Sequence, residues 1–180
     1  GIAALALHGR TREDMYLNTA RYSLIKEVKQ ILSIPVIANG DIDSPEKAKY
    51  VLDYTGADAI MIGRAAQGRP WIFREIAHYL DTGEHLAAPN IQEVKEVLQG
   101  HLSELYSFYG EYSGCRIARK HIAWYTKGLR SSNEFRQNMY KVESTTEQFK
   151  VVADYFDQLL AHGETMSDVQ VEQVNLLETK

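Results

Sequence analysis

The sequence predicts an α/β protein, namely the C-terminal portion of a (β/α)8 TIM barrel followed by an all-α helical bundle domain. Short apolar runs alternate with amphipathic helical patterns through residues 1–83, as is typical of parallel strands joined by right-handed crossovers. The spacing between these runs, roughly 25–30 residues, suits a barrel or a doubly wound sheet. From residue 91 onward the periodicity is helical.

The first part contains three strand–helix repeats. Its predicted strands are the apolar runs 2–8, 34–38 and 58–62, and its first predicted helix covers 21–32. Ser44 and Pro45 predict the start of the next helix, which Gly56 ends. A tight turn or short helix is expected over 63–67, and a further helix opens at Pro70 and ends at the DTGE stretch, residues 81–84. Three repeats cannot close an eight-stranded barrel, so we expect earlier strands in a segment that precedes Gly1.

The second part is expected to be a small bundle with short connections. Its predicted helices cover 91–109, 115–127, 133–142 and 144–161, the last one capped by Ser144 or Thr145. Residues 163–180 are polar, and no structure is assigned to them. The predicted division is therefore a barrel part over 1–83, a helical domain over 91–162 and a tail over 163–180.

The composition narrows the class of protein. The 180 residues are 44% hydrophobic and 24% charged, with a formal net charge of −4. No apolar run is long enough to cross a membrane and no secretory signal is present, so we expect a cytoplasmic protein with no membrane partner. The one cysteine, Cys115, excludes an internal disulfide and a multi-cysteine metal site, and we expect no metal. Cys115 begins the predicted basic helix, where a thiolate is favoured, but its distance from the strand ends favours a structural role.

Glycine and polar residues follow the second and third predicted strands. Asn39, Gly40 and Asp41 come after one, and Gly63 and Arg64 after the other. The carboxyl ends of parallel strands meet at one edge, and barrels often hold phosphate in their last two loops. Backbone amides and the Arg64 guanidinium therefore predict a phosphate site. The alternative is that these are ordinary turn residues.

His8 ends the first predicted strand and precedes Arg10 and Arg12. A histidine in this position is placed to face an anionic cofactor or substrate. The alternative is a histidine that packs in the loop beside two solvated arginines.

A basic segment lies within this acidic chain. Residues 116–141 contain seven Lys or Arg residues and one acid, Glu134. Four of the cations fall within about 100° of arc on one helix: Arg116, Arg119, Lys120 and Lys127. This cationic face is typical of phosphate-backbone binding, with candidates for stacking on unpaired bases in Trp124, Phe135 and Tyr140. The alternative is a solvated helix face over core aromatics.

Four stretches together resemble the bacterial tRNA-dihydrouridine synthases of the B type. They are HGRTR, IPVIANGDI, DYTGADAIMIGRAAQGRPWIFREI and RIARKHIAWY, within a resemblance that covers residues 1 to about 160. The resemblance implies an FMN-binding barrel followed by a helical tRNA-binding domain. It also implies a reaction in which FMN reduced by NADPH delivers hydride to a uracil of tRNA, with a cysteine as the acid.

The resemblance also implies residue roles. The cofactor-binding residues would be His8, Asn39, Gly40, Asp41, Gly63 and Arg64, and the RNA-binding residues Arg116, Arg119, Lys120 and His121. The family's catalytic cysteine belongs to an earlier strand, so no catalytic residue is expected in this chain. We expect a monomer in the full-length form, and weak or no FMN binding by this chain alone. Alternative functions are a non-catalytic RNA-binding remnant and another FMN or sugar-phosphate barrel enzyme.

Overall fold

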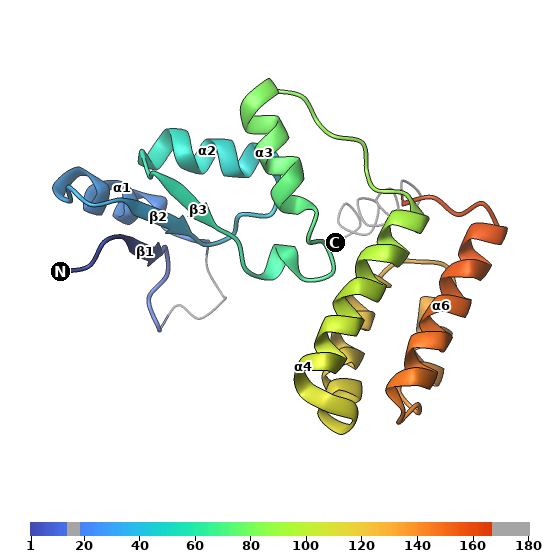
Figure 1. The fold of residues 1–180 in the computed structure, drawn as a ribbon. Helices are drawn as coiled ribbons and strands as arrows, with labels where there is room; N and C mark the ends of the chain where they lie inside the picture. The colour runs from blue at the N-terminus through green and yellow to red at the C-terminus, as the bar shows by residue number, and fades with distance from the viewer. Residues whose placement is uncertain (14–18, 167–180) are drawn as a thin grey trace. The chain divides into compact units, whose positions relative to one another are not determined.

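A computed structural model describes residues 1–13 and 19–166 (Figure 1). The chain divides into two compact units, residues 1–86 and residues 87–180. Because the described residues end at 166, most of the predicted tail over 163–180 lies outside them. Among the described helices, none is both long and apolar enough to span a membrane.

The first unit contains a parallel sheet in the order β1-β2-β3. Its elements are β1 (Leu5–His8), α1 (Tyr22–Ile31), β2 (Val36–Asn39), α2 (Pro45–Thr55), β3 (Ala59–Met61), the 3₁₀ turn η1 (Arg64–Ala66) and α3 (Ile72–Thr82). In the sheet register, His8 lies opposite Asn39, and Asn39 opposite Met61. The last residues of all three strands therefore stand side by side, and the polar residues after them emerge at one edge.

One face of this sheet packs against the helices. The core contains Val36 and Ala38 of β2 together with Ile25, Val51 and Ile72 of the three helices, all fully buried. Successive side chains of a strand point to opposite faces of the sheet, so the strand residues that alternate with the buried ones lie on the face away from the helices. There, Ala6 and Ala59 are exposed and Met61 is 45% exposed. Apolar burial thus holds the sheet on its helical side.

The residues that begin and end α2 confirm two predictions from the sequence. The Ser44 side chain accepts from the amide of Lys47 at 3.1 Å as the N-cap of α2, and Gly56 ends that helix at φ 69°. Some boundaries were wrong. The first two strands start at Leu5 and Val36, later than predicted. The helix expected from Pro70 starts at Ile72, because residues 69–72 first form a turn closed by the Ile72 amide and the Arg69 carbonyl.

The described part of the second unit is helical. It contains α4 (Ile91–Tyr125), α5 (Ser132–Met139) and α6 (Thr145–Ala161), and α4 lies beside α6 (Figure 1). The predicted break between 109 and 115 was wrong in extent, because Gly110 alone leaves the helical conformation, at φ 72° and ψ −179°. Helix α4 therefore bends at Gly110 and resumes directly afterward.

The bend also ends the apolar stripe on the first part of α4. Ile91, Val94, Leu98, Leu102 and Leu105 are buried as their spacing predicts. Tyr109 continues the same spacing but is 49% exposed, because the adjacent bend takes it off the packed face.

Hydrogen bonds of Gln148 and Glu111 fix α4 against α6 on both sides of the bend. The buried Gln148 accepts from the Tyr106 hydroxyl at 2.8 Å and donates to the Cys115 carbonyl at 3.2 Å. Just after the bend, the Glu111 carboxylate accepts from the amide and the hydroxyl of Thr145, at 2.8 and 2.5 Å. The helix segment that carries the basic residues is thereby held in one orientation within its unit.

Candidate functional site

The strand ends of the first unit line an open cleft of about 690 Å³. The six residues predicted to bind a cofactor are all among its lining residues: His8, Asn39, Gly40, Asp41, Gly63 and Arg64. Ile42, Asp43, Met61 and Ala65 complete the lining. The structure therefore brings together residues from three separate strand ends.

Asp41 organises the positively charged side of this cleft. One carboxylate oxygen accepts from Arg10 at 2.6 Å and from the amide of Ala20 at 2.8 Å, and the other accepts from Arg64 at 3.1 Å. Desolvation alone would raise the pKa of Asp41, but the hydrogen bonds from Arg10 and Ala20, with the nearby charges, lower it below the usual value. Asp41 is therefore ionised at neutral pH and orients two guanidinium groups.

Asn39 joins the three strand ends. Its side-chain oxygen is 2.7 Å from Nδ1 of His8, and its side-chain nitrogen donates to the Met61 carbonyl at 2.8 Å. Because the amide oxygen can only accept, Nδ1 of His8 is the donor. Asn39 thus fixes the imidazole orientation at the rim of the cleft.

The two glycines of the cleft differ in what surrounds them. Gly40 has φ 128°, and an added Cβ would lie 2.8 Å from the Cβ of Ala20. The hydroxyl of Tyr22 also donates to the Gly40 carbonyl, at 2.7 Å. At Gly63 an added Cβ would meet nothing within 4 Å. Gly40 is therefore required by close packing, whereas Gly63 borders open space.

Sequence reasoning missed part of the support behind the cleft. The Arg10 side chain is only 5% exposed and is paired with Asp41, although its position after His8 suggested a solvated or ligand-facing arginine. Ala20 and Tyr22 also contact the Asn39–Asp41 loop. These contacts join residues 18 to 31 positions apart, and no local sequence pattern signals them.

The second unit exposes a narrower cationic face than the sequence predicts. Arg116, Lys120 and Lys127 are exposed on α4 or just beyond it. Arg119, predicted to belong to this face, is half-buried and donates to the Val142 carbonyl at 3.0 Å. Its guanidinium therefore ties α4 to the α5–α6 connection.

His121 lies between two other rings. Its centroid is 4.7 Å from that of His101 and 5.0 Å from that of Trp124. Burial, with the neighbouring His101 and Lys120, lowers the pKa of His121 to about 4. The ring is neutral at pH 7, and at that pH it offers hydrogen bonding and stacking instead of positive charge.

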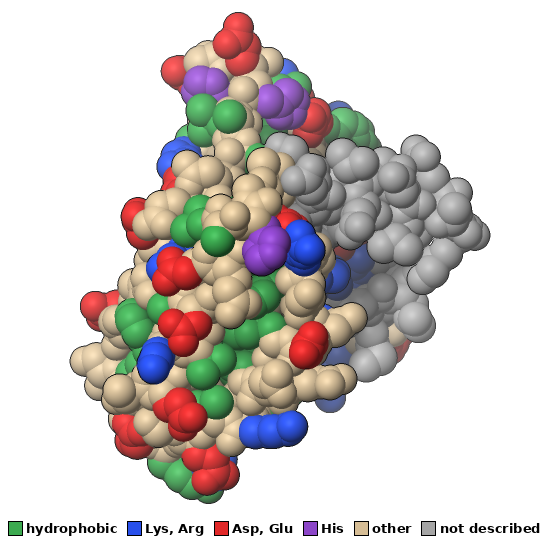
Figure 2. All heavy atoms as spheres, turned by 90° about the vertical axis from the view of Figure 1, so that its right-hand side faces the viewer, with side chains coloured by type: hydrophobic (Ala, Val, Ile, Leu, Met, Phe, Trp, Pro, Cys, Tyr) green, Lys and Arg blue, Asp and Glu red, His purple; other side chains and the backbone are tan. Residues whose placement is uncertain are grey.

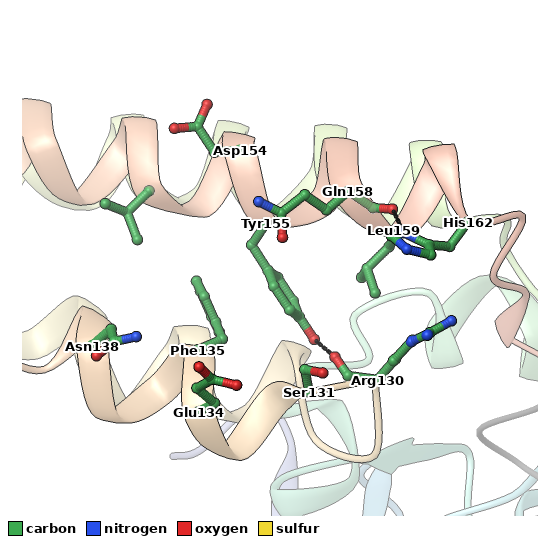
Figure 3. Close-up of a pocket in the computed structure, with 11 residues that line it drawn as sticks. Arg130, Ser131, Glu134, Phe135, Asn138, Asp154, Tyr155, Gln158, Leu159 and His162 are labelled. Carbon is green, nitrogen blue, oxygen red and sulfur yellow. Dashed lines mark hydrogen bonds between the residues drawn. The ribbon is translucent and has the colours of Figure 1, made fainter.

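The suggestion that Phe135 stacks on RNA bases was wrong. Phe135 is 8% exposed, and its ring stacks on Tyr155 with centroids 4.0 Å apart. This pair belongs to a pocket of about 350 Å³ between α5 and α6, in which the Tyr155 hydroxyl donates to the Arg130 carbonyl (Figure 3). Tyr140, by contrast, is 44% exposed, and Trp124 is half-buried.

Cys115 is buried in the second unit, at 1% exposure, with its Sγ 3.5 Å from the Val142 carbonyl. Burial raises the pKa of its thiol, so the suggestion of a favoured thiolate was wrong. This placement agrees with a structural role.

Two further observations concern the described residues as a whole. Over residues 1–13 and 19–166, no group of three or more His, Cys, Asp or Glu residues is arranged to hold a metal ion. Figure 2 shows a face of the molecule on which acidic and basic side chains are interspersed, with apolar side chains between them.

Comparisons with known proteins identify the family of this chain. The dihydrouridine synthase (Dus) family model matches residues 1–160. Three similar relatives are all named tRNA-dihydrouridine synthase B. The protein of Shewanella oneidensis is 58% identical over 160 residues, which are 89% of this chain and 49% of the relative. The protein of Vibrio vulnificus is 59% identical over 157 residues, covering 87% and 49%. The protein of Pseudomonas aeruginosa is 55% identical over 163 residues, covering 91% and 49%.

The chain therefore spans about half the length of the curated relatives that it matches. The resemblance to the bacterial B type is confirmed by these relatives. The chain belongs to the dihydrouridine synthase family.

Proposed function

We propose that this chain supplies the phosphate-binding strand ends and the tRNA-binding helices of a flavin-dependent enzyme that reduces uridine in tRNA to dihydrouridine. The observation that carries the proposal is the single cleft formed by His8, the Asn39–Asp41 loop and the Gly63–Arg64 turn, in a chain of the dihydrouridine synthase family. In this proposal the parallel sheet is part of a TIM barrel, whose active edge is the carboxyl edge of the strands.

The donor chemistry of the cleft fits the phosphate of FMN on one side. The Arg64 side chain is 58% exposed, and open space adjoins Gly63. A guanidinium beside closely approachable backbone suits phosphate oxygens. Asp41 and Asp43 also line the cleft, so we place the phosphate toward Gly63 and the exposed Arg64 side chain, whose charge offsets that of Asp41.

The roles of this chain's own residues follow from their contacts. Asp41 holds Arg64 toward the ligand, and Asn39 holds the His8 ring at the rim. Bound FMN, reduced by NADPH, would supply the hydride for the uracil ring. We place the catalytic cysteine in the half of the relatives that this chain does not match.

The helical unit supplies the proposed tRNA contacts. Arg116, Lys120 and Lys127 are exposed cations on or next to one helix, which suits phosphate-backbone contacts. Arg119 and His121 support this surface from half-buried positions. The printed names of the relatives refer to tRNA, and this chain is more than half identical to them.

A chimera tests the proposal. Residues 1–160 of this chain replace the matching half of the Vibrio vulnificus relative, and the purified protein is assayed for bound flavin and for dihydrouridine in an unmodified tRNA. We expect a flavin-containing, active chimera. Arg64→Ala should lower the flavin content, while Arg74→Ala, an exposed arginine on α3, should leave it unchanged.

A folded chimera without flavin would contradict the cofactor proposal. A flavin-containing chimera that oxidises NADPH with a small-molecule acceptor but leaves tRNA unmodified would favour another FMN enzyme. Equal flavin content in both arginine variants would contradict the phosphate position.

A further inference from the structure

Two aromatic and two cationic side chains line one side of α4 after its bend. Tyr112, Arg116, Lys120 and Trp124 follow one another at intervals of four residues. Residues four apart are neighbours on a helix surface, so these four side chains form one row. We call them the α4 row.

Contacts within the row are cation–π pairs. The Arg116 guanidinium lies 3.6 Å from the centroid of the Tyr112 ring, and the Lys120 ammonium lies 5.8 Å from that of Trp124. Nevertheless, Tyr112 is 69% exposed. The guanidinium covers one face of the Tyr112 ring. Because the side chain is nevertheless largely exposed, the other face of the ring is accessible. Exposed pairs of this kind contribute little to folding, which leaves binding as the use that the geometry favours.

The neighbouring sequence before the bend adds exposed aromatic surface. Phe108 is 81% exposed and Tyr109 is 49% exposed, with ring centroids 4.8 Å apart. Large aromatic side chains exposed in succession mark an interaction surface. Because Arg116 and Lys120 lie over the aromatic rings of the α4 row, charge complementarity favours an anionic partner with flat rings.

We propose that Tyr112, backed by Arg116, is a stacking site for an unpaired nucleobase of the RNA substrate, with Arg116 and Lys120 meeting the adjoining phosphates. This inference rests on the proposed tRNA function and adds a specific contact to it. Aromatic side chains stack on unpaired bases, whereas paired bases in a duplex hide their faces. The site therefore distinguishes a loop or an opened stem from a continuous duplex.

The test uses the full 180-residue chain and an unmodified tRNA transcript, with affinity measured by fluorescence anisotropy over a salt series. Tyr112→Leu removes the ring, and Tyr112→Phe keeps it. Phe73→Leu, at a 53% exposed aromatic of α3, is the matched control. We expect Tyr112→Leu to weaken binding roughly tenfold at every salt concentration, Tyr112→Phe to restore it, and the control to leave it unchanged.

The salt dependence of binding distinguishes a Tyr112 ring that stacks on a base from one that only positions Arg116. Loss of a phosphate contact reduces the salt slope by about one, while loss of a stacked base lowers affinity with the slope unchanged. If Tyr112→Leu changes only the slope, Tyr112 acts by holding Arg116, and the stacking site is wrong. A 12-residue single-stranded RNA should show the same loss, and a duplex of that sequence should not. An equal loss on the duplex would overturn the inference.

Lys127→Ala separates this inference from the proposed function. If Lys127→Ala weakens tRNA binding and Tyr112→Leu does not, the RNA function stands and the stacking site fails. If neither variant nor a charge reversal of Lys120 and Lys127 affects binding, the proposed RNA function itself fails.

Discussion

The strand-end cleft and the cationic face of the second unit both present cations to an anion, but they hold them differently. In the cleft, Arg64 is paired with Asp41, which is also bound by Arg10 and the Ala20 amide. In the second unit, Lys120 on α4 and Lys127 just beyond the helix are exposed cations. Ligand binding and folding should therefore be coupled in the cleft and separable in the second unit.

The largest expected effect is that of Asp41→Ala. This change leaves the nearly buried Arg10 without its carboxylate and leaves Ala at a backbone φ of 50°. Breaking such a pair by removing one partner costs about 3 kcal/mol. Urea unfolding should show this loss in the transition of the first unit. The exposed Asp43, which lines the same cleft, is the control, and Asp43→Ala should change stability by less than about 0.5 kcal/mol.

Gly40→Ala should rank next. It places a side chain at φ 128° and 2.8 Å from the Ala20 Cβ, so we expect a loss of about 2 kcal/mol. Gly63→Ala should cost clearly less, because its Cβ meets nothing within 4 Å. Thermal unfolding of the two variants makes the comparison. Equal losses would mean that the two strand ends are packed alike, contrary to the difference described here.

In the second unit, Lys127→Ala should leave the free energy of unfolding within about 0.5 kcal/mol of the wild-type value, because the Lys127 side chain is exposed. It should reduce the salt slope of tRNA binding by about one. Arg119→Ala is the informative counterpart, because its half-buried guanidinium donates to the Val142 carbonyl. That variant should lower stability as well. A large stability loss in Lys127→Ala would contradict the expectation that ligand binding and folding are separable in the second unit.

The smallest expected effect concerns His121. Its pKa in the folded protein, about 4, lies below the ordinary value of 6.5, so the unfolded chain binds more protons between these values. Stability should fall slightly as the pH drops from 6.5 toward 4, and less so in His121→Gln. Because the folded ring is neutral from pH 8 to 6, His121 should not strengthen tRNA binding over that range. An increase abolished by His121→Gln would contradict the depressed pKa.

Local sequence rules predicted much of the framework. Ser44, Gly56 and Ser144 mark helix ends in the sequence and in the structure, because capping chemistry acts over a few residues. The polar strand ends were predictable because parallel strands align their carboxyl ends at one edge.

Contacts between distant residues could not be predicted in this way. The burial of Arg10 beside Asp41, the inward turn of Arg119 and the stacking of Phe135 on Tyr155 depend on packing between segments far apart in sequence. The bend at Gly110 likewise moved Tyr109 off the packed stripe and left it exposed beside Tyr112. Periodicity alone assigns such residues to the wrong environment.

A double-mutant cycle on Asp41 and Arg10 most directly tests the claim that the cleft is one coupled unit. Asp41→Asn and Arg10→Gln are made singly and together, and the free energy of unfolding is measured for each. Because the two charged groups lie 2.6 Å apart, we predict a coupling energy of at least about 1 kcal/mol. Additive losses, with a coupling below about 0.3 kcal/mol, would contradict the account.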